Sequence, residues 1–212
     1  MTDVSDRILE EFIDACHSVA RRGLVRCSSG NMSRRLDESR LLATATRSWM
    51  ENISAKELSM CRISDGILLD GSKPTAEIAF HTAILQTRPD VNVVLHFQSP
   101  YATALACRSK DDANYFVIPE IPFYIGHVTR IPYLVPGSRE LGEAVANAMQ
   151  DHNMAIMSNH GLVTVANDYS HAIQNAAFFE LACEIIAHGG ETLNTLSEAD
   201  VEALIALRHT AG

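Results

Sequence analysis

The sequence has no cysteine pattern of the kind that indicates a disulfide framework. Its five cysteines are odd in number and lie scattered at positions 16, 27, 61, 107 and 183, with no Cys-x-x-Cys pair among them. This usage is typical of reduced thiols in a cytoplasm, so we expect a cytoplasmic protein.

Basic residues and long hydrophobic runs are also scarce. The chain has 17 Lys and Arg against 26 Asp and Glu, a net charge of -9. This balance argues against a nucleic-acid-binding protein, which usually needs a basic patch, although a local basic pocket for a phosphorylated substrate is compatible with it. No apolar run approaches the roughly 20 residues of a membrane span, and the first residues show no signal-peptide core. We therefore expect neither a nucleic-acid nor a membrane partner.

The composition that remains is that of a folded protein. Hydrophobic residues make up 47% of the 212 positions and charged residues 20%. Helical and strand patterns alternate without a linker-like break, so we expect residues 1–212 to form a single α/β domain with helices covering a mixed sheet. The patterns predict helices at 3–22, within 72–89, at 99–108, in the second half of 131–151, at 168–190 and at 197–209. They predict strands at 40–46, at 66–71, at 91–97, at the start of 131–151 and, as two short ones, within 154–167.

The stretch "VVLHFQSP" carries the clearest chemical signal. An apolar strand ends in His96, and Gln98 follows two positions later. Residues i and i+2 of a strand point to the same face, so the two side chains aim at one spot. The spacing alone leaves three interpretations open: a metal centre with a changed ligand, a site that has lost its metal, or an ordinary strand end.

Two other polar residues stand where an apolar element meets a loop. His160 lies in a predicted turn between two short strands, and Glu77 lies at the start of a predicted helix. Nitrogen and carboxylate ligands from separate elements suit zinc, although a single histidine near a strand is more often a structural residue. The remaining histidines, at 17, 81, 127, 152, 171, 188 and 209, have no local signal of function.

Four segments occur in a recognisable order: "GLVRCSSGNMSRR", "KPTAEIAFHTAILQTRPDVNVVLHFQSPYATALA", "IPYLVPGSRELGEAV" and "NHGLVTVANDYSHAIQNAAFFE". Together they resemble the class II aldolase/adducin family over about residues 8–190. The resemblance implies a three-layer α/β/α fold with a mostly antiparallel central sheet. It also implies a homotetramer with active sites between neighbouring subunits.

The resemblance further implies a divalent metal, usually zinc. Family members hold it on a His-x-His strand, a later histidine before glycine, and a glutamate. Those positions correspond here to His96, Gln98, His160 and Glu77. The amide oxygen of Gln98 could still coordinate, but it is a harder and weaker donor than imidazole. The expected ion is zinc, with Mn²⁺, Co²⁺ or Mg²⁺ as alternatives.

The family's phosphate pocket uses a Ser-Gly-Asn turn, a Thr-Gly pair and a serine pair before the glutamate. The matching residues are Ser29, Gly30, Asn31, Thr46, Arg47, Thr75 and Ala76. Arg47 in place of glycine and Ala76 in place of serine are departures. The arginine could contact phosphate, block the pocket, or favour a carboxylate substrate.

A family tyrosine that assists proton transfer falls in "IPEIPFYIG". Alignment places Phe123 at that position, with Tyr124 next to it. We therefore name Tyr124 as the candidate for this catalytic role.

The expected reaction is retro-aldol cleavage of a small phosphorylated ketose such as L-fuculose 1-phosphate, giving dihydroxyacetone phosphate and an aldehyde. The metal would stabilise the negative charge of the enediolate, and Glu77 would act as general acid/base. Two alternatives stay open: a sugar-phosphate 4-epimerase or dehydratase on the same fold, and a non-catalytic, adducin-like scaffold protein.

Overall fold

A computed structural model describes residues 4–109 and 113–210. Its helices are α1 (Asp6–Arg21), α2 (Ile78–Thr87), α3 (Pro100–Ala106), α4 (Arg139–Ala148), α5 (Tyr169–Gly189) and α6 (Glu198–Thr210), with short helical turns η1 (Ala55–Glu57), η2 (Ile121–Ile125) and η3 (Gly190–Thr192). Its strands are β1 (Asn31–Arg35), β2 (Arg40–Thr44), β3 (Leu58–Arg62), β4 (Leu68–Gly71), β5 (Val93–Phe97), β6 (Thr129–Ile131), β7 (Met154–Met157) and β8 (Gly161–Ala166).

The eight strands form one sheet in the order β4-β3-β2-β1-β5-β8-β7-β6. Every neighbouring pair is antiparallel except β6 and β7, which are parallel. The α/β class and the mostly antiparallel sheet are therefore confirmed. The assignment of residues 1–212 to one domain stays a prediction.

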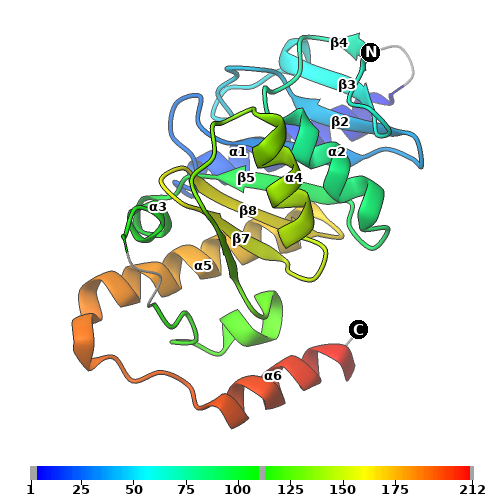
Figure 1. The fold of residues 1–212 in the computed structure, drawn as a ribbon. Helices are drawn as coiled ribbons and strands as arrows, with labels where there is room; N and C mark the ends of the chain where they lie inside the picture. Colours follow the sequence, from blue (N-terminus) through cyan, green and yellow to red (C-terminus); the bar gives the residue numbers. More distant parts are fainter. Residues whose placement is uncertain (1–3, 110–112, 211–212) are drawn as a thin grey trace.

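Helices cover both faces of the sheet (Figure 1). One face carries α2 and α4, which pack against each other, and the other carries α1, α3 and α5. The last helix, α6, lies beside η2 and away from the strands (Figure 1). Within residues 4–109 and 113–210, no helix is both long and apolar enough to cross a membrane.

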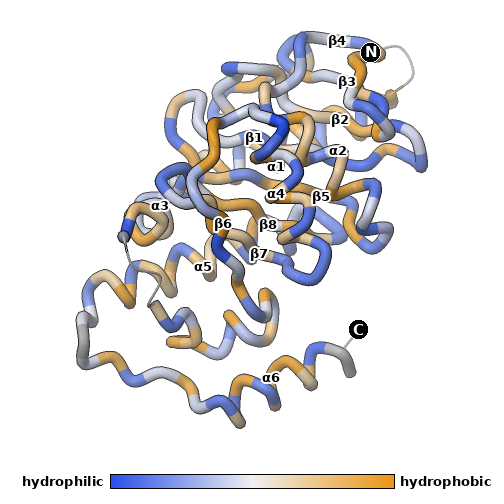
Figure 2. The backbone as a smooth tube through the Cα atoms, viewed as in Figure 1, coloured by the Kyte–Doolittle hydropathy of each residue, from blue (hydrophilic) through white to orange (hydrophobic). Residues whose placement is uncertain are grey.

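Alternation along β5 decides which face carries the polar residues. Val93, Leu95 and Phe97 pack into the core under α1, α3 and α5, whereas Val94 packs into the core under α2 and α4. Because side chains alternate along a strand, His96 shares the face of Val94. The whole strand is buried, and it lies within a hydrophobic stretch of backbone (Figure 2).

The sheet register brings distant segments to this histidine. Asn31 of β1 pairs with His96 on one side, and Val163 of β8 pairs with it on the other. The loop before β8 and the loop before β1 therefore meet at the end of β5. The start of α2 lies above them on the same face, which closes the site from a third direction.

The sequence patterns missed two strands of the sheet, β1 and β3. β3 (Leu58–Arg62) was not expected, because its sequence LSMCR has neither clear alternation nor β-branched residues. It forms because β2 and β4 pair with it on both sides, and four of its five residues are buried. Tertiary pairing here overrides a weak local preference.

Candidate metal centre

Three side chains from separate elements converge at the end of β5. Glu77 immediately precedes α2, His96 belongs to β5, and His160 lies in the turn before β8. One ligand atom from each lies within 4.8 Å of the others. The Nε2 atom of His96 is 3.5 Å from Oε2 of Glu77, and Nε2 of His160 is 3.4 Å from Oε1 of the same carboxylate.

The backbone fixes the orientation of His96. Its Nδ1 lies 2.9 Å from the carbonyl oxygen of Leu162 on the neighbouring strand, and this carbonyl can only accept a hydrogen bond. The proton therefore resides on Nδ1, and Nε2 presents a lone pair to the cluster. Metal-binding histidines are commonly oriented in this way by a backbone carbonyl.

Two glycines allow the close approach of these strands. A Cβ atom at Gly161 would lie 2.8 Å from the carbonyl oxygen of Phe97 and 3.0 Å from Cε1 of His96. A Cβ atom at Gly30 would lie 2.7 Å from the carbonyl oxygen of His96. Side chains at these positions would push the turns away, so glycine is needed to keep the ligands together.

The donor set fits a divalent cation. Glu77 is only 7% exposed, and its Oε1 has no hydrogen-bond partner within the described structure. A carboxylate buried in this way is costly unless a cation compensates its charge. Burial lowers the pKa of His160 and so keeps its imidazole neutral, with a smaller contribution from His96, while Glu77 acts in the opposite direction. Neutral imidazoles and one carboxylate are the ligand forms that a divalent metal requires.

All the residues predicted for substrate binding line one cavity with these ligands. The cavity measures about 320 Å³. It is lined by Ser29, Gly30, Asn31, Thr46, Arg47, Thr75, Ala76, Glu77, His96, Gln98 and His160, with Ser28, Ala45, Pro136 and Gly137. Gln98 lies against Gly161 at the cavity wall, and its coordination of a metal stays a prediction.

Arg47 lines the cavity in an unusual backbone conformation. Its φ angle is 61°, in the left-handed region that glycine adopts freely and other residues avoid. The conformation costs an arginine roughly 1–2 kcal/mol. Glycine would adopt this conformation without that cost, so an arginine here is unusual.

The side chain of Asn31 has partners that the sequence did not indicate. Its Nδ2 donates to Oε2 of Glu77 at 2.8 Å, and its Oδ1 lies 2.6 Å from Nε2 of His81. Nδ1 of His81 lies 2.7 Å from Oγ of Ser33. The sequence analysis did not identify His81 and Ser33 as functional candidates, and neither residue borders the cavity. The spacings Asn31/Ser33 in a strand and Glu77/His81 in a helix were the available signals.

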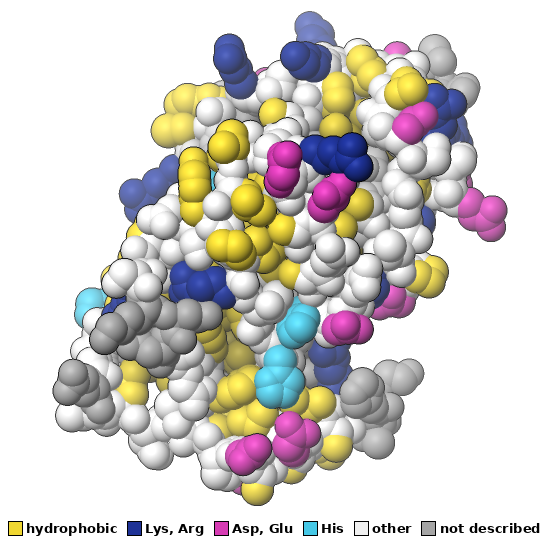
Figure 3. Space-filling view, viewed as in Figure 1, with side chains coloured by type: hydrophobic (Ala, Val, Ile, Leu, Met, Phe, Trp, Pro, Cys, Tyr) yellow, Lys and Arg dark blue, Asp and Glu magenta, His cyan; other side chains and the backbone are white. Residues whose placement is uncertain are grey.

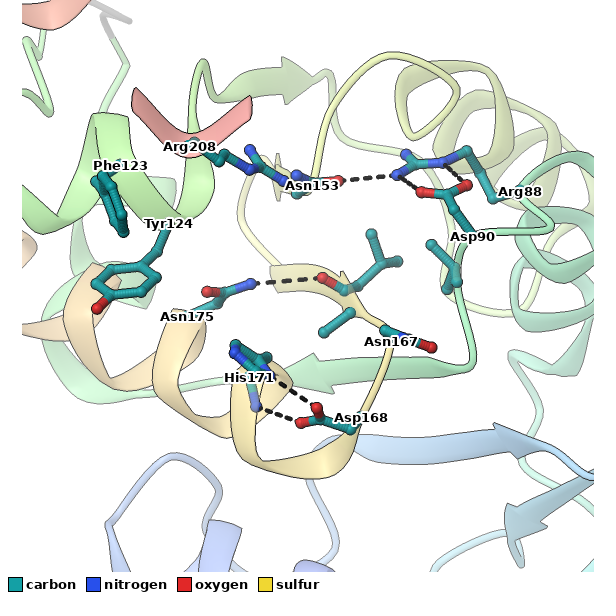
Figure 4. A pocket seen from close by; sticks show the side chains of 13 residues that line it. Arg88, Asp90, Phe123, Tyr124, Asn153, Asn167, Asp168, His171, Asn175 and Arg208 are labelled. Carbon is teal, nitrogen blue, oxygen red and sulfur yellow. Dashed lines mark hydrogen bonds and ion pairs between the residues drawn. The ribbon is translucent and has the colours of Figure 1, made fainter. Parts of the chain in front are cut away.

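Phe123 and Tyr124 are not part of this cavity. They belong to η2 and line a second cavity of about 500 Å³ with Arg88, Asp168 and other residues (Figure 4). The ring of Tyr124 stacks on Phe178, with centroids 5.5 Å apart. Within one chain, the candidate tyrosine is therefore not brought to the metal ligands.

Comparison with known proteins places the chain among related enzymes. Residues 10–187 match the model of the "Class II Aldolase and Adducin N-terminal domain". The chain is 31% identical to the 3-oxo-tetronate 4-phosphate decarboxylase of Haemophilus influenzae over 208 residues, which cover 96% of this chain and 98% of that protein. It is also 31% identical to the L-fuculose phosphate aldolase of Methanococcus maripaludis strain C5, over 77% of this chain and 87% of that protein.

Solved structures share the fold. An Escherichia coli protein whose reaction is left open between aldolase, epimerase and decarboxylase superposes with a TM-score of 0.89 at 28% identity, covering 94% of this chain and 98% of that one. An L-fuculose 1-phosphate aldolase superposes with a TM-score of 0.84 over 96% of this chain and 97% of that one. Its 21% identity supports the fold alone.

Proposed function

This chain belongs to the class II aldolase and adducin family, and we propose that it is a metal-dependent lyase acting on a small sugar phosphate. The reaction that we favour is decarboxylation of a 3-oxo acid phosphate such as 3-oxo-tetronate 4-phosphate. One observation carries this choice: a strained arginine, Arg47, shares the cavity of the metal ligands. A 3-oxo acid brings a carboxylate for it to bind.

Decarboxylation and aldol cleavage share an intermediate for these substrates. When the bond between C1 and C2 of 3-oxo-tetronate 4-phosphate breaks, CO₂ leaves. The electron pair of that bond stays on C2 and forms the enediolate of dihydroxyacetone phosphate. Retro-aldol cleavage of a ketose 1-phosphate leaves the same enediolate and releases an aldehyde instead. One proton delivered to carbon completes either reaction. The two reactions therefore differ in the leaving group and in what holds it.

The cluster of Glu77, His96 and His160 would hold the metal. A divalent ion there, zinc by analogy or Mn²⁺, Co²⁺ or Mg²⁺ given Gln98, would supply Lewis-acid stabilisation of the negative charge that develops on the substrate oxygens. The lone pair on Nε2 of His96 and the burial of Glu77 support this assignment.

The two oxygens of Glu77 have different surroundings. Asn31 donates to Oε2, whereas Oε1 has no hydrogen-bond partner within the described structure. We assign proton transfer to Oε1, because it can accept or release a proton without breaking an existing hydrogen bond.

Hydroxyl groups around the cavity suit the substrate's phosphate. Ser29, Thr46 and Thr75 each border the cavity, together with Gly30 of the preceding turn. Arg47 stands beside Thr46 and can bind an anion with two parallel hydrogen bonds. With phosphate at the hydroxyls and carboxylate at Arg47, both ends of a short substrate would be held across the metal.

Aldol cleavage of a phosphorylated ketose is the second candidate, supported by the similarity to the L-fuculose phosphate aldolase. A catalytic Tyr124 would then have to come from a neighbouring subunit, because in its own chain it lies in the second cavity. A homotetramer with sites at subunit contacts provides for this. Tyr133 and Val135 are exposed and precede Pro136 and Gly137 of the cavity lining. Figure 3 shows hydrophobic side chains gathered on one face of the molecule.

A substrate panel separates the reactions. Metal-loaded protein is incubated with 3-oxo-tetronate 4-phosphate made in situ and with several ketose phosphates, and CO₂, dihydroxyacetone phosphate, aldehydes and isomers are measured against an enzyme-free control. Accelerated release of CO₂ supports the proposal, and aldehyde release without CO₂ supports aldol cleavage. An isomer without cleavage indicates an epimerase, loss of water indicates a dehydratase, and inactivity with no bound metal indicates a scaffold protein.

A further inference from the structure

Four buried side chains form one continuous run of hydrogen bonds that ends on a metal ligand. Ser33 contacts His81 at 2.7 Å, His81 contacts Asn31 at 2.6 Å, and Asn31 contacts Glu77 at 2.8 Å. The exposed fractions of Ser33 and His81 are 0%, and those of Asn31 and Glu77 are 7%. The run lies under the floor of the cavity, where water does not reach its inner end.

The fold holds these side chains in place with regular elements. Asn31 and Ser33 are two residues apart on β1 and share a face. Glu77 and His81 are four residues apart at the start of α2 and share a side of the helix. The ring of His81 stacks on that of Phe80, with centroids 4.6 Å apart, which restricts its rotation.

With a neutral imidazole at His81, only one arrangement of protons satisfies every contact while Glu77 is ionised. A carboxylate accepts, so Asn31 must present its NH₂ group to Glu77 and its carbonyl oxygen to His81. That oxygen accepts, so His81 carries its proton on Nε2. Nδ1 of His81 is then a lone pair and accepts from the hydroxyl of Ser33. Each donor in the run is thus set by its neighbour.

We propose that His81, held by Ser33, is a positioning residue that fixes the orientation of the Asn31 amide and thereby the placement of Glu77 in the metal site. With the amide so fixed, Oε2 of Glu77 is anchored and Oε1 alone faces His160. A rotated amide would direct its carbonyl oxygen at the carboxylate and repel it. The side chain of Asn31 is then engaged with Glu77. In the Ser29-Gly30-Asn31 turn, the backbone remains available to bind substrate.

The surroundings of His81 favour a fixed neutral ring. Burial, with a smaller contribution from His96, lowers the pKa of His81 to about 3. A charged imidazole would need to donate from both nitrogens, and the carbonyl oxygen of Asn31 and the hydroxyl of Ser33 could accept both. In that form the Ser33 hydroxyl would accept a hydrogen bond from Nδ1 of His81 and would no longer donate to it. The hydrogen bonds from Ser33 to Glu77 would then not all point in one direction.

The alternative explanation is that these four hydrogen-bonded side chains only stabilise the core. Buried, fully paired polar networks often do so. The two explanations differ in what a variant changes. A structural role lowers stability and leaves metal affinity and turnover per folded molecule intact, whereas a positioning role changes metal affinity and the place of Glu77 as well.

Four variants test the inference in the full-length protein. H81L removes both nitrogens at similar volume, H81Q keeps an N–H donor within reach of Asn31, and S33A removes the hydroxyl that donates to Nδ1 of His81. The matched control is T82V, because Thr82 is the next residue of α2, is 5% exposed, and spends its hydroxyl on carbonyl groups of its own helix. Each variant is compared with wild type for Zn²⁺ and Mn²⁺ affinity by chelator competition, thermal midpoint and kcat.

We expect H81L to lose about 10- to 100-fold in metal affinity, a loss typical of groups that orient a ligand. S33A should lose roughly 2- to 10-fold, H81Q should recover most of the H81L loss, and T82V should lower only the thermal midpoint. Metal affinities of H81L and S33A equal to that of T82V would overturn the inference.

Two measurements on metal-free protein keep the inference separate from the proposed function, on which it rests. Nitrogen NMR of labelled imidazole should show His81 as the Nε2–H tautomer, and a crystal structure of S33A or H81L should show Glu77 displaced from Asn31. The opposite tautomer, or an unmoved Glu77, overturns the positioning role even if the enzyme is active. A wild-type protein that binds no metal overturns the proposed reaction, and these two measurements still decide the orientation of Asn31.

Discussion

Two cavities of the molecule differ in character. The larger of the two, about 500 Å³, lies among η2, α5, α6 and the end of β8, and the smaller one, about 320 Å³, surrounds the metal ligands. In the larger cavity the charged groups already have partners. Arg88 binds Asp90 through two hydrogen bonds, and the ring of His171 binds Asp168 at 2.8 Å (Figure 4).

The smaller cavity keeps buried polar atoms without hydrogen-bond partners. Oε1 of Glu77 and Nδ1 of His160 are buried and have no hydrogen-bond partner within the described structure. Proteins rarely leave such atoms unpaired unless a ligand, water or ion completes them. Two such atoms on neighbouring residues therefore mark the site better than cavity volume does.

The largest effect is expected at Glu77. E77Q keeps the size of the side chain but removes its charge and its capacity to move a proton. We expect kcat to fall by about 10³-fold, within the range for loss of a general acid/base, and metal affinity to fall as well. Steady-state kinetics and chelator competition measure the two losses, with circular dichroism as a check of folding. Near-normal turnover would remove Glu77 from the mechanism.

Arg47 should separate the two candidate substrates. R47G relieves the left-handed backbone and should raise stability by about 1 kcal/mol. It should also raise KM roughly 10- to 100-fold for a 3-oxo acid phosphate. The increase should be smaller for a ketose phosphate, which lacks the carboxylate.

Cys27 provides a matched control for that variant. Its φ angle is 54°, it is exposed, and it does not line the smaller cavity. C27G should therefore gain similar stability in urea unfolding without a change in KM. Equal KM effects of R47G on both substrate classes would show that Arg47 binds the shared phosphate or nothing.

Gln98 is expected to give a moderate effect. Q98H places a nitrogen donor two residues after His96, just beyond the end of β5 and in the lining of the same cavity. We expect zinc affinity to rise by roughly an order of magnitude, with a smaller change for Mn²⁺, because imidazole is a softer donor than an amide oxygen. Metal titrations of both proteins test this. Unchanged affinities for both ions would place Gln98 outside the coordination sphere.

The smallest effect is expected in the larger cavity. Burial raises the pKa of Asp168, but hydrogen bonds from the backbone and ring of His171 outweigh burial and lower it below its ordinary value. The carboxylate therefore stabilises the fold above its unfolded pKa, near 4, and this stabilisation is lost as the pH falls through the lower folded value.

D168N keeps a residue that can cap α5 but does not titrate. Because the side chain of Asp168 is 53% exposed, the pH-dependent difference in unfolding free energy should stay below about 1 kcal/mol. Urea midpoints between pH 6 and pH 3 measure it, and kcat should not change. A large loss of activity in D168N would mean that the larger cavity takes part in catalysis.

Sequence patterns predicted which three residues come together at the end of β5. The near-continuous apolar run "VNVVLHF" placed His96 near the end of a buried strand, and the ordered segments brought Glu77 and His160 to it. What local patterns could not predict is the register of β1 against β5. The contact of Asn31 with His81 depends on that register, so the four-residue spacing from Glu77 did not by itself single out His81 among nine histidines.

The candidate catalytic tyrosine, Tyr124, shows a second limit. The order of motifs along a chain predicts which residues belong together in a family, but it does not say which copy of the chain supplies them. Tyr124 lies in η2 beside α6, on the side of the larger cavity. A role for it at a metal site would require contact between subunits, which no pattern within one chain encodes.

The pairing of Asn31 with His96 across β1 and β5 has a thermodynamic consequence. Because the ligand-bearing strand lies inside the sheet and is fully buried, its amide hydrogens should exchange with solvent only through global unfolding. The site is then assembled before any ion arrives, and an ion bound there stabilises the whole fold by an amount that grows with the logarithm of its concentration. Metal would thus raise the melting temperature of the entire molecule and slow hydrogen exchange throughout the sheet, far from the atoms that it touches.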